Sequence, residues 1–260
     1  MRICVSAQST EHYSFGYDYH YPLHSAIYGL IAKSSPTYAE FLHDTGFIDA
    51  HKHLKLFTYS QLGFPGATRH AKGFRHVSAI KLYFSTPIPN SLEHIILGIF
   101  SDNKLMLNIT GTHCHFNINH VETLPEPSFL DAAHFTCLSP IAVSKASNTF
   151  TGKHFLDYMN PVERDDFVAA IHENLLQKYR LVHQKEFCGN ETFHFHFDPT
   201  YIIKRQGRIR KNIPFKDSHI IGMEAPFTIQ ADPALIKIGY ECGLGINNSA
   251  GFGMVEKTVK

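Results

Sequence analysis

The first half of the chain alternates between β-type apolar runs and apolar residues at helical spacing. Residues 2–7 predict a short strand. After a turn at Tyr19–Pro22, apolar residues at spacings of four, seven and eight predict a helix; they are Leu23, Ile27, Leu30 and Ile31. Ser35 and Pro36 predict the start of a second helix, which Gly46 ends. Further strands are expected at Lys55–Ser60, Arg75–Thr86 and Leu105–Val121, and a further helix opens at Ser91–Leu97.

The second half repeats this plan after Leu124-Pro125-Glu126-Pro127, whose two prolines indicate a linker. A strand is expected at Phe135–Val143. Asn160-Pro161-Val162-Glu163 has the form of a capping box, and the helix that it predicts carries apolar residues at every fourth position: Phe167, Ile171, Leu175 and Tyr179. Strands are expected at Phe193–Phe197, Tyr201–Arg205, Phe227–Gln230 and Gly253–Val259, and a last helix runs from Asp232 to about Tyr240.

The order of these elements is βααββαβ in the first half and βαββαβ in the second. We therefore predict an α+β fold of two tandem ferredoxin-like domains, residues 1–124 and residues 125–260, with a glycine-rich loop near the C-terminus. The repeat is visible in the order of elements and not in the sequence itself.

Composition narrows the class of protein. The chain has 260 residues, 43% of them apolar and 18% charged, with a net charge of +1, which is typical of a globular protein. No apolar run approaches the length of a membrane span, and the N-terminus turns polar too early for a signal peptide. The five cysteines are far apart and include no C-x-x-C pair, so we expect a cytoplasmic protein without a disulfide framework. Near-neutral charge excludes a globally basic nucleic-acid coat but permits a local basic groove.

A glycine-rich loop is the sharpest motif in the chain: Gly243-Leu244-Gly245-Ile246-Asn247-Asn248-Ser249-Ala250-Gly251-Phe252-Gly253. Such a loop lets the backbone approach a ligand and point N–H groups at an anion. It lacks the Gly-Lys-Ser/Thr of a phosphate-binding P-loop, and Asn248 stands where a dinucleotide fingerprint needs glycine. Spacing alone does not distinguish a binding loop from a plain glycine-rich turn.

A basic segment comes earlier in the same half. Five cations fall within eight residues around Gly207: Lys204, Arg205, Arg208, Arg210 and Lys211. A basic hairpin of this kind can hold phosphates. A charged edge strand that prevents aggregation has the same composition, so the segment alone does not decide between the two.

Histidine is abundant, with 19 copies, and three His-x-His pairs occur: His51/His53, His113/His115 and His194/His196. On a strand the members of each pair share one face, a spacing that can bind zinc. Around His194 and His196, the phenylalanines at 193, 195 and 197 take the opposite face. Neither a carboxylate nor a cysteine stands at ligand spacing, except Cys114, which alternation places on the other face. A histidine-based metalloprotein is therefore the weaker interpretation.

A resemblance to a known family identifies candidate catalytic residues in the first half. The segments Y-P-L-H-S-A-I-Y-G-L-I, Y-A-E-F-L-H-D and K-L-F-T-Y-S resemble the N-terminal region of the CRISPR-associated repeat-processing endoribonucleases, the Cas6 family of the RAMP superfamily. G-L-G-I-N-N-S-A-G-F-G is similar to the glycine-rich loop of that family. Thr136–Val143 resembles the strand that opens its second domain. The resemblance runs from about Tyr19 to Val255.

The resemblance implies two ferredoxin-like domains and metal-independent cleavage within the repeats of precursor CRISPR RNA, without a cofactor. It assigns catalysis to Tyr28, His43 and Lys55. The ribose 2′-hydroxyl would attack the adjacent phosphate, giving a 2′,3′-cyclic phosphate and a 5′-hydroxyl. A base and an acid would move protons while a cation stabilises the developing charge. In this assignment His43 serves as acid or base, Tyr28 donates a hydrogen bond or orients the hydroxyl, and Lys55 stabilises the charge. The resemblance leaves open which of His43 and Tyr28 is the base.

His24 stands four residues before Tyr28 on the same helix face and is a local competitor of His43. Within the resemblance, the five cations of the basic segment would hold phosphates. The loop residues that would contact the RNA are Gly243, Gly245, Asn247, Asn248, Ser249, Gly251 and Gly253. The expected partner is CRISPR repeat RNA, and no membrane is expected. An RNA-holding subunit of an interference complex that does not cut is the alternative. The sequence leaves homodimerisation open.

Overall fold

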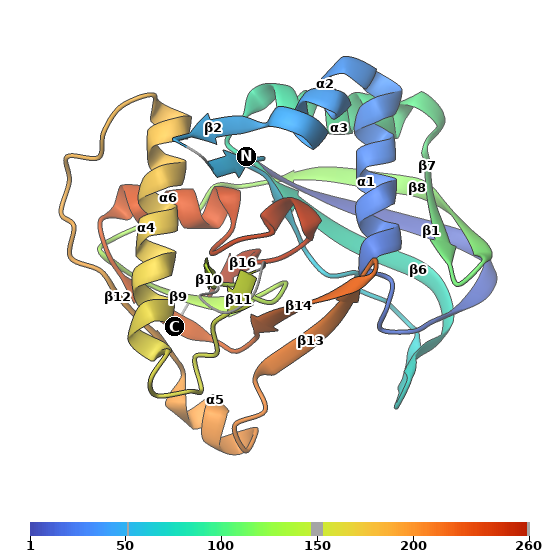
Figure 1. Ribbon diagram of the computed structural model, residues 1–260. Coiled ribbons are helices and arrows are strands. Elements are labelled where there is room, and N and C mark those ends of the chain that lie inside the picture. Colours follow the sequence, from blue (N-terminus) through green and yellow to red (C-terminus); the bar gives the residue numbers. More distant parts are fainter. Residues whose placement is uncertain (51, 147–152, 259–260) are drawn as a thin grey trace.

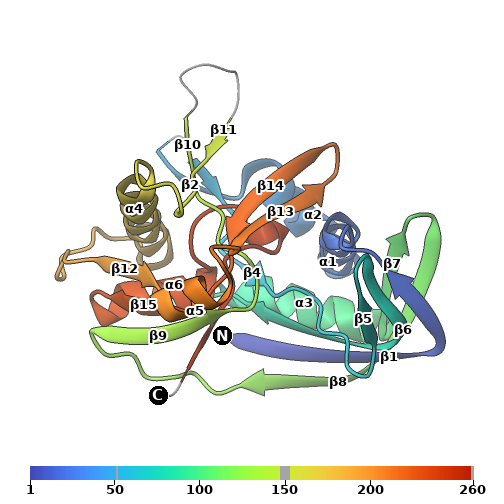
Figure 2. The same cartoon turned by 90° about the horizontal axis from the view of Figure 1, so that it is seen from below.

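The first half of the chain folds into an antiparallel sheet. The computed structural model describes residues 1–50, 52–146 and 153–258. The strands of this sheet are β1 (Arg2–Phe15), β4 (Thr58–Tyr59), β5 (Thr68–His70), β6 (Gly73–Ser85), β7 (Lys104–Ile109) and β8 (Thr112–Leu124). Their order is β4-β6-β1-β8-β7, and β5 pairs with β6. Helices α1 (His20–Ser34) and α3 (Pro89–Asp102) lie on one face of the sheet (Figure 2).

The second half repeats this topology with a smaller sheet. Its elements are β9 (Ala132–Cys137), α4 (Arg164–His183), β12 (His194–Phe197), β15 (Phe227–Gln230), α6 (Pro233–Cys242) and β16 (Val255–Lys257). The strand order is β12-β15-β9-β16. In both sheets the four strands of the βαββαβ unit therefore lie in the order fourth, first, third, second, each antiparallel to its neighbour. The predicted α+β class and the tandem ferredoxin-like plan are confirmed.

Smaller elements connect these units (Figure 1). They are α2 (Pro36–Glu40), the π-helical turn η1 (Phe41–Thr45), the hairpin of β2 (Phe47–Asp49) and β3 (Lys52–Leu54), the hairpin of β10 (Ser144–Ala146) and β11 (Lys153–Phe155), α5 (Pro199–Lys204), the hairpin of β13 (Arg210–Phe215) and β14 (Ser218–Met223), and the short 3₁₀ turn η2 (Asn248–Ala250). None of the helices in the described ranges combines the length and the apolar character that a membrane-spanning segment needs.

Each sheet packs against its helices around its own hydrophobic core. The apolar stripe predicted for the first helix is buried, and so is the stripe predicted for the helix at 160–179; the two sets are Leu23, Ile27, Leu30, Ile31 and Phe167, Ile171, Leu175, Tyr179. Fully burying one such side chain contributes about 1.5–3 kcal/mol. Leu56 belongs by sequence to the first half, yet it packs in the second core.

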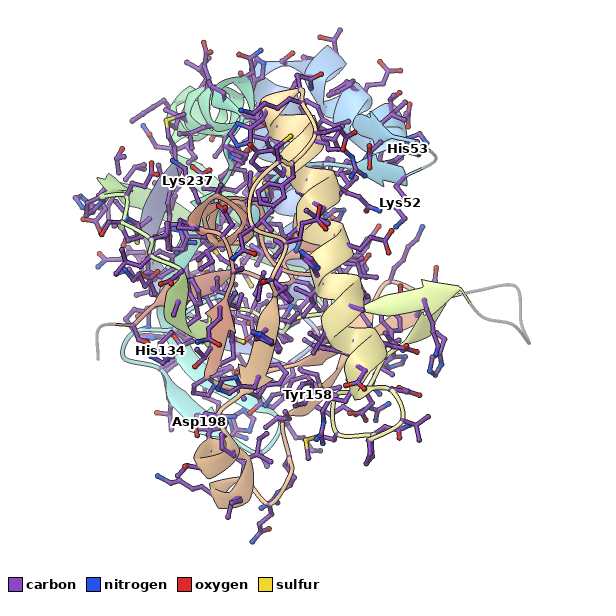
Figure 3. All side chains as sticks on the ribbon, turned by 90° about the vertical axis from the view of Figure 1, so that its left-hand side faces the viewer. Lys52, His53, His134, Tyr158, Asp198 and Lys237 are labelled. Carbon is purple, nitrogen blue, oxygen red and sulfur yellow. The ribbon has the colours of Figure 1, made fainter. Side chains whose placement is uncertain are left out.

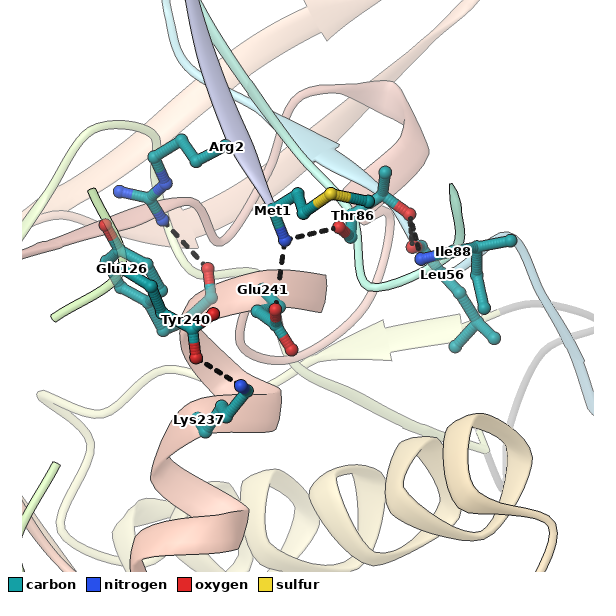
Figure 4. Close-up of polar contacts among 9 residues, drawn as sticks. All are labelled: Met1, Arg2, Leu56, Thr86, Ile88, Glu126, Lys237, Tyr240 and Glu241. Atoms are coloured by element: carbon teal, nitrogen blue, oxygen red, sulfur yellow. Dashed lines mark hydrogen bonds and ion pairs between the residues drawn. The ribbon is translucent and has the colours of Figure 1, made fainter. Parts of the chain in front are cut away.

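Polar contacts near the chain start join the two halves (Figure 4). The Arg2 side chain is only 2% exposed, donates to the Tyr240 carbonyl at 2.8 Å and pairs with Glu256 at 2.7 Å. Its guanidinium lies 3.6 Å from the centre of the Tyr240 ring. Thr86 Oγ1 donates to the Leu56 carbonyl at 2.7 Å. Thr86 thus bonds the Leu56 backbone to the first half while the Leu56 side chain packs in the second core, so this segment lies between the two cores.

Four predicted strands are wrong in extent; the first, expected at residues 2–7, runs from Arg2 to Phe15. Leu105–Val121 is a hairpin of two strands, because Thr110 and Gly111 have φ values of 47° and 84° and form a tight turn. In Lys55–Ser60 only Thr58–Tyr59 pair as a strand, since Leu56 has φ 54° and bends the chain. The strand expected at Phe135–Val143 ends at Cys137.

One segment predicted as a strand is a helix, and the predicted first residues of helix α4 and of the last strand are wrong. Tyr201–Arg205 lies in helix α5 and its C-cap. Asp198, which Figure 3 labels, immediately precedes this helix, and its carboxylate accepts hydrogen bonds from the Thr200 and Tyr201 amides. Helix α4 begins at Arg164 and not after a capping box at Asn160, whose side chain instead accepts from Val162 N in a turn. The last strand covers Val255–Lys257; Val259, its expected end, lies outside the described residues.

Candidate active site

Tyr28 and His24 lie one turn apart on the flank of α1. The apolar stripe of α1 faces the core, so these two side chains are half-buried at its edge, with ring centres 4.6 Å apart. His24 Nδ1 lies 2.9 Å from the Ser249 carbonyl oxygen, which comes from the glycine-rich loop. If Nδ1 carries the proton and donates to that carbonyl, Nε2 is left with a free lone pair.

Burial controls the electrostatics of this pair. It raises the pKa of Tyr28, and a hydrogen bond with Ser249 acts in the opposite direction. It lowers the pKa of His24, which the Ser249 carbonyl raises and the charge of His43 lowers. Tyr28 therefore keeps its proton at neutral pH and can act as a donor, whereas His24 is biased towards the neutral imidazole.

His43 lies in the π-helical turn η1 and is 78% exposed. Its Nδ1 is 2.6 Å from Asp44 Oδ1, which leaves Nε2 facing away from the carboxylate. The Ser35 hydroxyl caps the preceding helix α2 as the sequence predicts, with Pro36 at its first turn. The chain then turns at Gly46, whose amide donates to the Phe41 carbonyl at 2.6 Å. π-Helical turns often occur at functional sites.

Lys55 reaches the same turn from the segment after β3. Its Nζ donates to the His43 carbonyl oxygen at 3.0 Å. A side chain at Gly46 would meet the Leu54 carbonyl at 2.7 Å and Lys55 Cδ at 2.9 Å, so glycine is what lets this lysine cross the turn. Burial lowers the pKa of Lys55, and Asp44 raises it. The structure thus brings Lys55 and His43 into direct contact.

Two clefts lie near these residues. One, of about 540 Å³, lies between α1 and β7, and the larger one, of about 940 Å³, opens beside Lys55. Its walls come from the 52–57 segment, from helix α4 and from the glycine-rich loop at 245–249. Lys52 and Lys145 add positive charge to this cleft, and Glu173 adds negative charge. Figure 3 shows Lys52 and His53 on the hairpin beside α4. Lys55 and Ser249 both line this cleft, and the Ser249 carbonyl also contacts His24.

The glycine-rich loop packs tightly on its own chain. A side chain at Gly245 would meet the Ala142 carbonyl at 2.2 Å, and one at Gly253 would meet the Leu244 carbonyl at 2.0 Å. The predicted glycines at 243, 245, 251 and 253 are buried, whereas Asn247 and Ser249 are half-exposed at the apex. The Asn248 amide is bonded internally: Nδ2 donates to Leu244 O at 3.1 Å and to Phe252 O at 2.9 Å. The glycines thus let the loop backbone pack closely against other backbone groups of this chain.

The basic segment does not form the predicted hairpin. Lys204 ends α5, Arg205 caps it, and Arg210 opens strand β13. Arg210 Nε lies 3.4 Å from Asp157 Oδ2, and Lys211 Nζ lies 3.7 Å from Glu224 Oε2. Arg208 and Arg205 contact their own neighbours, Gln206 and Tyr201.

The hairpin that follows the basic segment leads to α1. At its far end, Phe215 packs against His24 with ring centres 5.4 Å apart. The five residue steps from Arg210 to Phe215 cover roughly 16 Å at the rise of a strand. The basic segment and the α1 site therefore lie at opposite ends of one hairpin, as Figure 1 shows.

The His-x-His pairs alternate as predicted. His113 and His115 are exposed on β8 while Cys114 is buried, and His194 and His196 are exposed on β12 while Phe195 and Phe197 are buried. His51 lies outside the described residues. Within the described part of the chain, His, Cys, Asp and Glu side chains form no group of three or more that could hold a metal ion.

Sequence reasoning missed two contributors to this region. Lys178 on α4 donates hydrogen bonds into the glycine-rich loop, and Phe215 packs on His24. Its position in the sequence could have identified Lys178, because it stands three residues after Leu175 and so falls on the apolar face of the helix. Phe215 carries no signal, because only the fold brings β13 to α1.

Comparisons with known proteins agree with this architecture. A family model described as CRISPR-associated protein Cas6, N-terminal, matches residues 14–121, and one described as CRISPR associated protein Cas6, C-terminal, matches residues 124–257. The chain is similar to CRISPR-associated endoribonuclease Cas6 1 of Methanocaldococcus jannaschii, at 28% identity over 98% of this chain and 92% of that one. It is 29% identical to CRISPR-associated endoribonuclease Cas6 of Pyrococcus furiosus, over 92% and 82% of the two chains. A solved structure described as CRISPR associated protein Cas6 has a TM-score of 0.77 and 28% identity, covering 100% of this chain and 99% of that one.

Proposed function

The chain belongs to the Cas6 family of CRISPR-associated proteins, and we propose that it is an endoribonuclease that cuts precursor CRISPR RNA within the repeats to give mature guide RNAs. The family match spans both halves, and two relatives are named endoribonucleases. The observation that carries the proposal is the hydrogen bond of Lys55 Nζ to the His43 carbonyl, at a cleft that Ser249 also lines. The Ser249 carbonyl in turn contacts His24, the neighbour of Tyr28. In this proposal residues 1–124 carry the catalytic groups, and residues 125–260 carry the loop and the basic segment.

The chemistry follows from these positions. The substrate supplies its own nucleophile, the 2′-hydroxyl, and the products carry a 2′,3′-cyclic phosphate and a 5′-hydroxyl. A base takes the proton of the 2′-hydroxyl and an acid gives a proton to the departing 5′-oxygen. His43 performs one of these two transfers through Nε2, since Nδ1 faces Asp44. Lys55 stabilises the charge that develops on the phosphate, at the end of a side chain that is already anchored to the turn of His43. Tyr28, whose pKa is raised by burial, keeps its proton and donates a hydrogen bond. These steps use only side chains, so the reaction proceeds without a metal ion.

RNA binding in this proposal uses two surfaces. The half-exposed apex of the glycine-rich loop, with Asn247 and Ser249, contacts the strand next to the scissile phosphate. The five cations of the basic segment contact phosphates farther away, beyond the β13–β14 hairpin. Asp157 and Glu224 pair with Arg210 and Lys211 and reduce the positive charge of the basic segment. We therefore expect the five cations to contribute to RNA binding more than to the chemical step.

The test is cleavage of the cognate repeat RNA in excess chelator, beside the same RNA with a 2′-deoxy at each candidate nucleotide. The proposal expects cleavage at one site that a single 2′-deoxy blocks. Tight binding without cleavage identifies a repeat-holding subunit in its place. Cleavage only with added metal would overturn the mechanism and favour the histidine pairs.

A further inference from the structure

Lys178 is a fully buried cation beneath the glycine-rich loop. Its side chain projects from α4 and the residue is 1% exposed. Nζ donates to the Gly243 carbonyl at 2.6 Å, to the Gly245 carbonyl at 2.9 Å and to Asn248 Oδ1 at 2.8 Å. A lysine ammonium has three N–H donors and no acceptor, so this arrangement uses every donor that the charged form offers. A neutral amine would turn its lone pair towards one of these oxygens.

Among the described residues, no carboxylate forms an ion pair with Lys178, whose partners are two carbonyls and an amide oxygen. Burial lowers the pKa of Lys178 to about 7, and the Cys242 thiol on α6 raises it. Burial in turn raises the pKa of Cys242 to about 12, so the thiol is neutral. Lys55 and Glu173 line the cleft that Lys178 also borders. The three oxygens are therefore the direct partners that stabilise the ammonium, and each lies in the loop or at its entry.

The loop that carries these acceptors also contacts the candidate active site. Asn248, held by Lys178 through Oδ1, uses Nδ2 to bind the carbonyls of Leu244 and Phe252, which closes the loop on itself. Ser249 follows Asn248 directly, and its carbonyl oxygen lies 2.9 Å from His24 Nδ1. A short path of bonded groups thus leads from α4 to the side chains on α1.

We propose that Lys178 is a positioning residue that holds the glycine-rich loop against α1, so that Ser249 orients the His24–Tyr28 pair for RNA cleavage. This inference rests on the proposed function for its kinetic consequence. Its structural consequence, an ordered loop in the free protein, does not depend on cleavage. Release of the Asn248 side chain would let Ser249 shift, and a misplacement of about 1 Å near reacting groups can cost about 10²-fold in rate.

The experiment compares Lys178→Met, which keeps the length of the side chain and removes its donors, with Lys185→Met. Lys185 is exposed just beyond the end of α4, which makes it a matched control. Hydrogen exchange of the 243–253 segment is measured in the free protein. Single-turnover cleavage at saturating repeat RNA and the Kd for an uncleavable 2′-deoxy RNA are measured in parallel.

For Lys178→Met we expect exchange in 243–253 to accelerate about tenfold or more, since the hydrogen bonds to a charged donor are removed, while the strands of both sheets keep their protection. The cleavage rate at saturating RNA should fall about 10²-fold, with a much smaller change in Kd. Lys185→Met should match the wild type in all three measurements. A purely structural role would instead accelerate exchange throughout the protein.

Wild-type exchange in the loop of Lys178→Met, together with a wild-type cleavage rate, would overturn the proposal. If Lys178→Met does not fold, Asn248→Ala removes the same tether from the other side, and an unchanged loop in that variant would overturn it equally. A wild-type protein that binds RNA without cutting it would contradict the proposed function alone, because the exchange measurement still decides the role of Lys178.

Discussion

Helices α1 and α4 occupy the same place in the two halves, each following the first strand of its sheet, yet they present opposite kinds of side chain to the glycine-rich loop. The helix α1 offers His24 and Tyr28, half-buried at the edge of its core. The helix α4 offers Lys178, which is fully buried and has all its donors engaged. On the proposed function, the repeated fold separates two tasks: one helix keeps the reactive groups accessible, and the other immobilises the loop that contacts them.

The difference follows from the depth of each contact. A group that moves protons must reach the substrate, so it belongs on a flank of its helix and retains a free ring nitrogen or hydroxyl. A tether gains most where water cannot compete for its partners, so it lies within the apolar face. Each prediction below tests one side of this division.

The first prediction tests the chemistry assigned to the first half of the chain, where His43 lies in η1. His43→Ala should slow cleavage by about 10²–10⁴-fold while leaving binding of the RNA nearly unchanged, because the variant lacks a general acid–base group but keeps the cations that hold phosphates. Single-turnover rates and Kd values for an uncleavable RNA check this. His113→Ala, an exposed histidine on β8 of the same half, is the control and should cut normally. Normal cleavage by His43→Ala together with slow cleavage by His24→Ala would move the role to His24.

The second prediction concerns the buried cation on the α4 side. Its folded pKa of about 7 lies below the ordinary 10.5, so between these values the unfolded chain binds more protons than the folded protein. Lys178 therefore makes the free energy of unfolding rise with pH across that window, by at most about 1.4 kcal/mol per pH unit. Urea unfolding of the wild type and of Lys178→Met isolates the contribution, since Lys55, Glu173 and Cys242 are present in both proteins. Parallel pH curves for the two proteins would show that this lysine does not titrate in the window.

The third prediction contrasts the turns that lead into the last strand of each half. Gly111 and Gly253 both have positive φ, 84° and 74°, so alanine is strained at either site. A side chain at Gly111 meets open space, whereas one at Gly253 would lie 2.0 Å from the Leu244 carbonyl. Gly253→Ala should thus lower the free energy of unfolding by about 1–3 kcal/mol more than Gly111→Ala. Equal decreases in urea unfolding would mean that the loop can move away without cost.

Much of the fold follows from local pattern, and the errors have local causes. The stripes from Leu23 and from Phe167 are buried because a helix with one apolar face needs a core to cover it. The run at Leu105–Val121 conceals a turn, because Gly111 interrupts an otherwise regular alternation. Tyr-Ile-Ile at 201–203 has the composition of a strand, but the Asp198 cap starts a helix there. In that segment a capping bond outweighs β-propensity.

The candidate site was less accessible to sequence reasoning. The resemblance selected Tyr28, His43 and Lys55, and the structure places the last two in contact. The contact of His24 with Ser249 spans 225 residues, and those of Lys178 with the loop span 65 to 70 residues. No periodicity reports such distances along the chain. A lysine within an apolar stripe is the one local sign, and it indicates burial without naming the partner.

The last prediction tests whether the basic segment contributes to binding alone. Lys204 and Arg208 are exposed, without an acidic partner among the ion pairs of the described residues. Replacing both with glutamine should reduce the slope of log Kd against log salt by about 0.7 for each phosphate that is no longer neutralised, as expected for single-stranded RNA. The single-turnover rate at saturating RNA should stay constant, because these cations lie beyond the hairpin from His24. Lys72→Gln with Lys104→Gln, two exposed lysines of the first half, controls for net charge. An unchanged slope in the Lys204/Arg208 variant would remove the segment from the RNA path, and a slower chemical step would place it at the active site after all.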